Sequence, residues 1–181
     1  MRTSKRTQIL EAAARVVEHE GVKSVTFESV AAEAGLTKGG LLYHFASRDD
    51  LVQAIHQHLA NQWEASMTAA AGKPASRATT AERLTAYTRV ATQSATRAEL
   101  LFMLEGSTTA EHAAPWNAVI ERWAPPPAPA TDDPATLDPF IARLAADGLW
   151  LYESLTTERL DPDLRQAIAE RLAATLHRDG D

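Results

Sequence analysis

One short run of the chain, from residue 37 to residue 44, combines the kinds of side chain that contact DNA. It holds a cation, a hydroxyl and two long side chains with polar tips, which are the groups that bind phosphates and base edges. Each residue alone is more often an ordinary surface or packing residue, but the set together favours a nucleic-acid surface. The set consists of Thr37, Lys38, Gly39, Gly40, Tyr43 and His44.

Two adjacent glycines in this run carry a structural cost. Gly39 and Gly40 each lower helix propensity by roughly 1 kcal/mol relative to alanine. A backbone without Cβ atoms can, however, approach another surface closely, and the free N–H groups of a first helical turn suit a phosphate oxygen. The glycines therefore strengthen the prediction of a DNA contact.

The elements that must position these residues form a helix-turn-helix. Thr26 is a natural N-cap for a first helix, and Gly35 suits the left-handed residue that follows a helix end. Thr37 can then cap a second helix that runs to Phe45. Apolar residues at helical spacing over residues 7–20 predict a third helix that covers the pair.

The segment from Ile9 to Ile55 resembles the N-terminal DNA-binding domain of the tetracycline-repressor (TetR) family of bacterial transcription regulators. The resemblance is carried by the glycine-ended first helix, the run T-x-x-x-V-A-x-x-A-G-L-T-K-G and the run Y-H-F-x-S-R-x-x-L that opens the next helix. One departure is Leu42, which stands where many members have an aromatic residue that contacts phosphate. Tyr43 and His44 are therefore the expected carriers of DNA contacts.

The resemblance also implies roles for neighbouring residues. Thr26 corresponds to a backbone contact at the start of the first motif helix, and Arg48 to the cation that opens the fourth helix. Leu41 and Phe45 are expected in the core. A short basic arm before the first helix could reach phosphates or a minor groove. The residues of this arm are Arg2, Lys5 and Arg6.

Charge is divided unevenly along the chain. The net charge of −6 is unusual for a DNA-binding protein. Residues 1–48, however, hold seven Lys and Arg against five Asp and Glu, whereas residues 49–181 hold eleven against nineteen. Because the positive excess near the motif is small, we expect modest non-specific affinity, reliance on two half-sites of a dimer, and steep salt dependence.

The rest of the sequence predicts a second helical domain, so the expected fold class is all-α. A capping box beginning at Ser47 opens a connecting helix of about residues 48–71, and the proline-rich stretch 124–139 predicts an extended connection without helix. The expected domains are residues 1–47 for DNA binding and residues 48–181 for effector binding and dimerisation.

Large, adaptable side chains are dense in the second domain and permit two interpretations. They can line a pocket for a lipophilic or aromatic ligand, as the resemblance implies, or they can fill an ordinary core. Glu105, Glu111 and His112 are possible polar anchors, although solvated positions are the better-supported prediction for them. The candidate ligand-binding residues are Trp63, Met67, Tyr87, Phe102, Met103, Trp116 and Trp123.

The last two helices carry apolar residues on more than one side. One stripe can cover the core of its own chain and another a second copy, although complete burial within one chain is the alternative. The resemblance implies a homodimer with a four-helix interface. The expected interface residues are Phe140, Leu144, Gly148, Leu151, Leu155, Leu164, Ile168 and Leu172, and a neighbouring stripe is Ile141, Ala145, Leu149 and Tyr152.

These patterns predict a DNA-binding transcriptional regulator, a ligand-released repressor that binds palindromic double-stranded operator DNA as a homodimer. The effector is expected to be a small lipophilic or aromatic molecule of unknown identity. The alternative is a regulator that is constitutive or controlled by a protein partner, with no small-molecule effector.

Other classes are not indicated. No nucleophile–base pair, metal-spaced ligand set or glycine-rich phosphate loop suggests an enzyme, and no cofactor or metal is expected. His56 and His58 lie two residues apart and cannot face one metal from a helix. The absence of cysteine excludes disulfides. Without a long apolar run or signal peptide, the sequence predicts a soluble cytoplasmic protein with no membrane partner.

Overall fold

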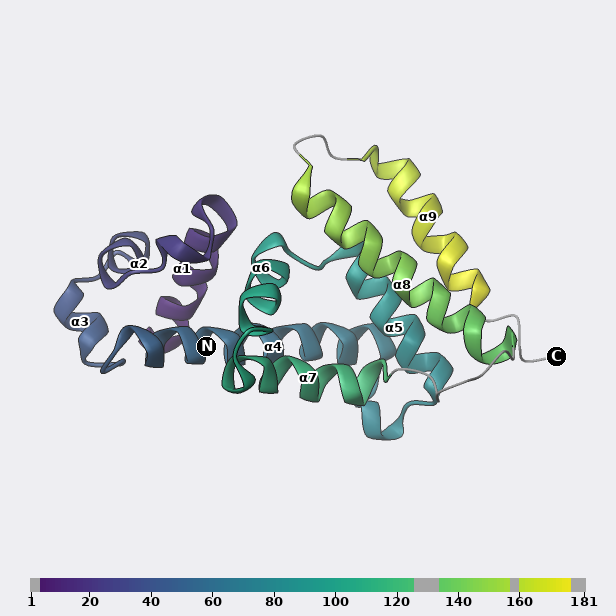
Figure 1. The fold of residues 1–181 in the computed structure, drawn as a ribbon, viewed down its shortest axis with the longest axis horizontal. Coiled ribbons are helices and arrows are strands. Elements are labelled where there is room, and N and C mark those ends of the chain that lie inside the picture. Colours follow the sequence, from purple (N-terminus) through teal and green to yellow (C-terminus); the bar gives the residue numbers. More distant parts are fainter. Residues whose placement is uncertain (1–3, 126–133, 157–159, 177–181) are drawn as a thin grey trace. The chain divides into compact units, whose positions relative to one another are not determined.

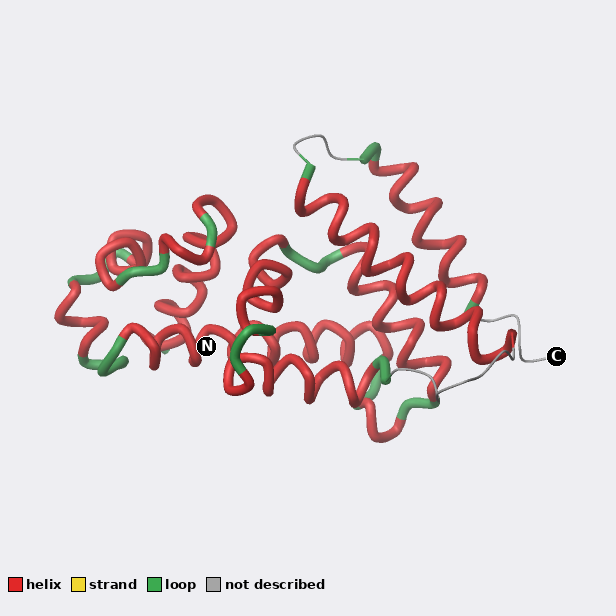
Figure 2. Tube along the Cα trace, viewed as in Figure 1, coloured by secondary structure: helices red, strands yellow, loops and turns green. Residues whose placement is uncertain are grey.

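The computed structural model describes residues 4–125, 134–156 and 160–176. Over these residues the chain is helical, as Figures 1 and 2 show, and no strand occurs among them, which confirms the predicted all-α class. The elements in chain order are α1 (Lys5–Glu20), η1 (Val22–Ser24), α2 (Phe27–Ala34), α3 (Lys38–Leu42), α4 (Arg48–Ala71), η2 (Ala75–Arg77), α5 (Thr80–Gln93), α6 (Arg97–Gly106), α7 (Ala110–Trp123), α8 (Pro134–Leu155) and α9 (Pro162–Thr175).

The chain divides into two compact units. The first unit holds Met1–Gln62 and Thr96–Trp116, and the second holds Trp63–Ala95 and Asn117–Asp181. Helices α4 and α7 therefore contribute residues to both units. This division differs from the predicted boundary after residue 47, because α6 packs against α1 and the first part of α7 contacts α4.

Local signals fix the ends of the first two helices. Gly21 and Gly35 follow α1 and α2 with φ of 85° and 66°, in the region that favours glycine. The Thr26 hydroxyl accepts a hydrogen bond from the Ser29 amide at 3.0 Å, which caps α2. These end signals hold α2 and α3 in the predicted helix-turn-helix.

A buried apolar cluster holds α1, α2 and α3 together. Ile9 and Val17 from α1 and Val30 from α2 are fully buried. Leu41 from α3 and Phe45 just after it join them with 0% and 3% of their surface exposed. The prediction that these last two residues belong to the core is confirmed, and their burial turns the opposite side of α3 outward.

Polar contacts join α1 to α6 within the first unit. The Arg97 guanidinium donates to the carbonyl of Glu18 at 2.9 Å, and the Glu18 carboxylate accepts from the Ala98 amide at 2.8 Å. Each helix thus supplies a side chain that hydrogen-bonds to a backbone group at the end of the other helix. Backbone groups at helix ends have no partner within their own helix, so these bonds stabilise both ends. These two hydrogen bonds fix α6 against α1.

Helices α5, α8 and α9 lie side by side in the second unit (Figure 1). Tyr87 and Val90 of α5 and Ala146 and Trp150 of α8 are buried in the core between them. The Asp161 carboxylate caps α9, and Pro162 occupies its first position. Among the described residues, none of the helices combines the length and the apolar character required to cross a membrane.

The predicted extended connection is wrong at its C-terminal end. Residues 126–133 lie outside the described residues, but α8 begins at Pro134 and includes Pro139. A proline at the first position of a helix loses no hydrogen bond, since the N–H groups of the first turn have no partner within the helix. Pro139 then removes one intrahelical bond close to the helix start, and the apolar residues that follow sustain the helix.

Candidate nucleic-acid interface and effector domain

The structure presents most of the predicted DNA-contact residues to solvent. Tyr43 has 86% of its surface exposed, and Leu42 has 45%. Thr37, Lys38 and Gly39 are exposed, whereas Gly40 and His44 are half-buried. The exposed side of α3 and the residues after it therefore form one surface, which we call the recognition surface, from Thr37 to His44.

Local hydrogen bonds shape this surface. The Thr37 hydroxyl accepts from the Gly40 amide at 3.1 Å and starts α3. The helix ends at Leu42 rather than at the predicted residue 45, although Phe45 still donates its amide to the Leu41 carbonyl at 2.9 Å. The rings of Tyr43 and His44 meet edge to face with centroids 5.2 Å apart, so the two side chains stand together.

The structure gives no internal reason for the two glycines of α3. A Cβ atom added at Gly39 would meet nothing closer than the Thr37 hydroxyl at 3.9 Å, and one added at Gly40 would meet the same atom at 3.4 Å. Both distances are ordinary van der Waals contacts. Since neither glycine has the positive φ that favours the residue, the absence of side chains here suits the close approach of another molecule.

Two of the candidate cations already have partners. The Lys38 ammonium lies 2.6 Å from the Glu28 carboxylate, and this hydrogen bond holds the pKa of Glu28 below its ordinary value. Both side chains are largely exposed, so water screens the pair. The Arg48 guanidinium donates to the Val25 carbonyl at 2.9 Å, which ties the start of α4 to the helix-turn-helix.

The basic arm is only partly described. Lys5 and Arg6 are exposed in the first turn of α1, and the Arg6 guanidinium lies 5.0 Å from the centre of the Phe45 ring. Arg2 lies outside the described residues. Thr26 is exposed, but its hydroxyl is engaged in the cap of α2. The DNA contacts expected of the basic arm and of Thr26 stay predictions.

The seven candidate ligand-binding residues divide between the two units. Those in the second unit include Trp63 and Tyr87, whose rings meet at 5.4 Å, while Met67 and Trp123 are fully buried there. Phe102, Met103 and Trp116 belong to the first unit, where the first and last contact His56. All but Met103 are buried, so these side chains serve as core in this structure.

A polar network in the second unit was not predicted. The Tyr87 hydroxyl on α5 donates to the Asp147 carboxylate on α8 at 2.7 Å, and the Arg143 Nε lies 3.7 Å from the same carboxylate. Burial raises the pKa of Asp147, and burial together with the nearby carboxylate raises the pKa of Tyr87. Tyr87 therefore stays a neutral donor. Because the partners are 60 residues apart in sequence, no spacing signal could have joined them.

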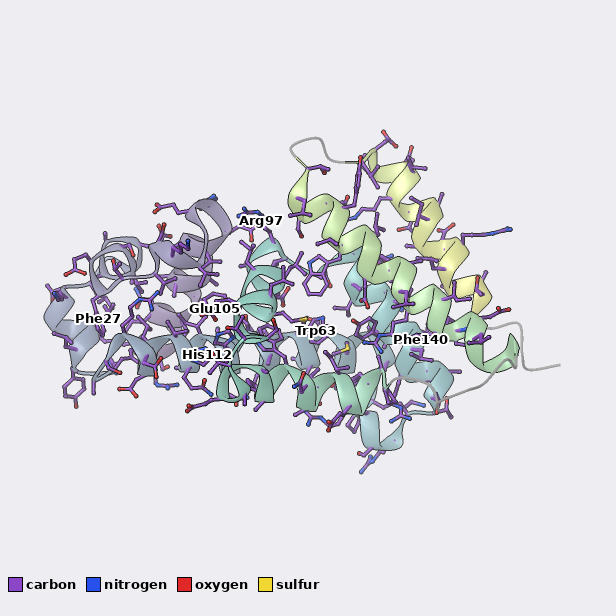
Figure 3. All side chains as sticks on the ribbon, in the orientation of Figure 1. Phe27, Trp63, Arg97, Glu105, His112 and Phe140 are labelled. Carbon is purple, nitrogen blue, oxygen red and sulfur yellow. The ribbon has the colours of Figure 1, made fainter. Side chains whose placement is uncertain are left out.

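A second unpredicted cluster lies in the first unit, where Figure 3 labels two of its members, Glu105 and His112. His56 of α4 is fully buried, and its Nε2 lies 2.9 Å from the Glu105 carboxylate of α6. His112 of α7 stacks on His56 with ring centres 4.6 Å apart. The expectation that His112 is solvated is wrong, since it is 8% exposed. Gly106 permits this packing, because an added Cβ would lie 2.9 Å from the His56 ring.

The hydrogen bonds of His56 decide what this cluster can bind. The three side chains offer ligand atoms within 4.8 Å of one another, a spacing compatible with a metal ion. The Trp116 indole N–H, however, donates to His56 Nδ1 at 3.0 Å, which puts the imidazole proton on Nε2, facing Glu105. A metal at Nε2 would require a proton on the other nitrogen, where the indole already donates. The cluster is therefore better suited to tie α4, α6 and α7 together by hydrogen bonds.

The last two helices expose apolar side chains in the single chain. Leu144, Leu151 and Leu155 of α8 have 52%, 41% and 69% of their surface exposed, and Leu164 of α9 has 50%. Gly148 is also exposed, while Phe140, Ile168 and Leu172 are half-buried. In the neighbouring stripe only Leu149 is buried, whereas Ile141, Ala145 and Tyr152 are exposed. The chain covers its own core with Ala142, Ala146, Leu149 and Trp150.

Two family models match the chain. One, described as bacterial regulatory proteins of the tetR family, matches residues 9–55. The other, described as the tetracyclin repressor-like C-terminal domain, matches residues 81–177, which is more than half of the chain. The HTH-type transcriptional regulator TtgR of Pseudomonas putida is 39% identical over 66 residues, a match that covers 33% of this chain and 31% of that protein. The chain thus matches about a third of the length of this relative.

Solved structures resemble the whole chain. A protein from Saccharomonospora viridis, described as a transcriptional regulator in complex with choline, has a TM-score of 0.68 at 18% identity and covers 96% of both chains. A transcriptional regulator from Rhodococcus sp. Rha1 has a TM-score of 0.65 at 17% identity, over 96% of this chain and 94% of that one. The multidrug binding protein EbrR, complexed with imidazole, has a TM-score of 0.54 at 25% identity, over 94% of this chain and 96% of that one.

Proposed function

Because the chain belongs to the TetR family of bacterial transcriptional regulators, we propose that it is a repressor that binds a palindromic operator as a homodimer and leaves it when an effector binds. Members of the family are regulators and not enzymes, which confirms the prediction of no enzymatic activity. In this proposal residues 1–47 bind DNA, residues 48–181 bind effector and dimerise, and the protein acts on DNA in the cytoplasm.

The recognition surface is the single observation that carries this proposal. Burial of Leu41 and Phe45 fixes one side of α3 in the core, and the other side presents Lys38, Tyr43 and an unobstructed glycine backbone. A recognition helix of a helix-turn-helix enters the major groove with its polar side toward base edges. The partly exposed Leu42, next to Tyr43 in the chain, lies at the edge of that contact.

Dimerisation is supported by the apolar side chains that α8 and α9 leave exposed. Four leucines with about half of their surface in water would gain roughly 25 cal/mol for each Å² that a second copy covers. These leucines are Leu144, Leu151, Leu155 and Leu164. A symmetric pair would place two recognition helices on one face of a duplex, with half-sites about one helical turn, roughly 34–36 Å, or a multiple of it apart.

Release of the protein from DNA by an effector follows from the thermodynamic linkage of the two binding equilibria. A ligand shifts the balance between two states only by its difference in affinity for them. If the effector favours a dimer whose recognition helices no longer match two half-sites, DNA and effector weaken each other to the same extent. The structural relatives solved with choline and with imidazole support a small-molecule effector for the same fold.

A regulator without an effector remains the second candidate. It is favoured by the tight burial of six of the seven candidate ligand-binding residues, which act as core in this structure. In that case a protein partner would control DNA binding, or binding would be constitutive.

Selection of bound sequences from random duplex DNA tests the proposal. The proposal predicts recovery of a palindrome whose half-site centres lie one or more helical turns apart, and affinity that falls steeply with salt. Recovery of no preferred sequence would overturn it. Native mass spectrometry of protein purified from its host would then separate the two candidates, because bound small molecules support effector control.

A further inference from the structure

We propose that the second unit contains a binding site for a monovalent organic cation, and that the guanidinium of Arg143 occupies this site in the present structure. The site is built from the Asp147 carboxylate and the rings of Tyr87 and Phe140. The rings of Trp63 and Trp150 back it from behind Tyr87. The inference rests on the proposed function, because it names the ligand class of the effector domain.

The position of Arg143 defines the site. Its guanidinium carbon lies 5.3 Å from the centre of the Tyr87 ring and 5.7 Å from the centre of the Phe140 ring. Both distances fall within the range in which a cation is attracted to an aromatic face. Its Nε lies 3.7 Å from the Asp147 carboxylate, which is too long for a direct hydrogen bond. The guanidinium is thus held by ring faces, by the charge of Asp147 and by a hydrogen bond that it donates to the Ala124 carbonyl.

Two further rings extend the aromatic wall. Trp63 of α4 meets Tyr87 at 5.4 Å with planes inclined by 69°, and it meets Trp150 of α8 at 6.1 Å with planes inclined by 37°. The three side chains have 1%, 3% and 5% of their surface exposed. Figure 3 labels Trp63 and Phe140, two of the aromatic residues around the site. An aromatic wall of this kind lowers the local dielectric and strengthens the attraction of a cation to the carboxylate.

The charges at the site favour a cation over an anion. Both the carboxylate of Asp147 and the faces of the rings attract positive charge, while Tyr87 stays neutral because its pKa is raised by burial. Burial also raises the pKa of Asp147, and Arg143 and the Tyr87 hydrogen bond only partly oppose this effect. If Arg143 leaves, the partly buried Asp147 carboxylate loses the cation that lies 3.7 Å from it. A ligand cation of similar size would restore the balance.

A ligand can reach the site from the Asp147 side. The Asp147 side chain is 34% exposed, and the Arg143 side chain is 12% exposed. Arg143 also donates a hydrogen bond to the Ala124 carbonyl, so its displacement carries a cost. The wild-type chain should therefore bind a simple cation weakly, and removal of the Arg143 side chain should strengthen binding.

Tryptophan fluorescence of the full chain, titrated with phenylguanidinium chloride without DNA and at constant ionic strength, tests the inference. We expect Arg143→Ala to bind about tenfold more tightly than wild type, a difference of about 1.4 kcal/mol. Adding Asp147→Asn to that variant should reverse the gain. Arg165→Ala is the matched control, because it removes a guanidinium that pairs with Glu153 at 2.7 Å instead of with Asp147.

Neutral phenylurea and anionic benzoate complete the experiment. Phenylurea should bind at least about tenfold more weakly than phenylguanidinium to Arg143→Ala. Equal binding of the two, tighter binding of benzoate to wild type, or no gain in Arg143→Ala would overturn the inference. If Arg143→Ala does not fold, Arg143→Gln replaces it with the same expected direction. Operator binding is measured in a separate experiment. A negative result for the cation site therefore does not bear on the proposal that the chain binds DNA.

Discussion

The recognition surface and the polar network around Asp147 differ in how the chain builds them. The cap of α3 joins Thr37 to Gly40, three residues apart, and the side chains around it point to solvent. Asp147 instead meets Tyr87 across 60 residues, between two helices and beside buried rings. The first site is encoded locally, and in the proposed function DNA binds to it, whereas the second exists only after the chain has folded.

The difference also concerns what each site lacks. Gly39 and Gly40 leave space on the recognition surface that nothing in the chain requires. Around Asp147 the space is filled, and Arg143 supplies the counter-charge from within. A surface with unused space is suited to a large partner such as a duplex, and a filled site is suited to a small ligand that replaces one side chain. A side chain added to the recognition surface should therefore weaken DNA binding. Removal of the Arg143 side chain should instead strengthen the binding of a cation.

Loss of the dimer should have the largest effect on DNA binding. Leu151→Glu with Leu155→Glu places charges on the exposed apolar face of α8, which should yield folded monomers in analytical ultracentrifugation. Operator affinity should fall by at least about a hundredfold, because two linked half-sites bind far more tightly than one. Leu104→Glu, at an exposed leucine of α6, is the control. Dimers that persist with full affinity would show that this face is not the interface.

Alanine at Gly39 should separate stability from DNA binding. The free chain has room for the added Cβ, and alanine favours helix, so the free energy of unfolding should rise by up to about 1 kcal/mol. Operator affinity should fall by about tenfold, since the methyl group stands between backbone and DNA. Thermal melting and fluorescence anisotropy measure the two effects. A variant with unchanged affinity would remove the argument for close approach.

The ion pair of Lys38 and Glu28 should affect how steeply operator affinity falls with salt concentration. Lys38→Gln should reduce the slope of log affinity against log salt by about 0.9, if this ammonium contacts one phosphate. Glu28→Gln should increase affinity at low salt, because it removes the carboxylate that competes with the phosphate. Anisotropy titrations over a range of salt concentrations test both. Parallel slopes for wild type and Lys38→Gln would exclude that contact.

Acid should weaken the fold slightly through His56. Burial lowers the pKa of this imidazole in the folded chain, so below about pH 6.5 the unfolded chain binds more protons. The stability that neutral His56 contributes is fully present above about pH 6.5, the pKa of the unfolded chain. It is lost as the pH falls toward the lowered pKa of His56 in the folded chain. His56→Gln should make the fall in Tm between about pH 7.5 and 5.5 smaller by about 3 °C. His19→Gln is the control, since His19 is exposed at the end of α1. An unchanged fall in Tm for His56→Gln would contradict the prediction.

The sequence predicted the parts of the fold that depend on neighbours along the chain. The left-handed Gly35 and the mutual capping of Ser47 and Asp50 were both read from local residue order and are present. The beginning of α8 at Pro134 was missed, because the two prolines were read as excluding a helix, although Pro134 at the first position loses no hydrogen bond and Pro139 removes only one.

The sequence could not predict sites that are assembled from distant segments. His112 was expected in solvent, but it stacks on His56, which lies on another helix. Asp147 and Arg143 carry no motif, and only the packing of α8 on α5 brings them to Tyr87. Side-chain type and spacing along one helix contain no information on such partners.

The central claim is that the recognition surface binds DNA and is not needed for folding. The most direct test is fluorescence anisotropy of a selected operator with the variant Tyr43→Ala, His44→Ala, alongside its thermal melting curve. Since Tyr43 is exposed and His44 is half-buried, we expect operator affinity to fall by at least about a hundredfold, or about 2.7 kcal/mol, with little change in Tm. Full affinity in a folded variant, or loss of folding, would contradict the account.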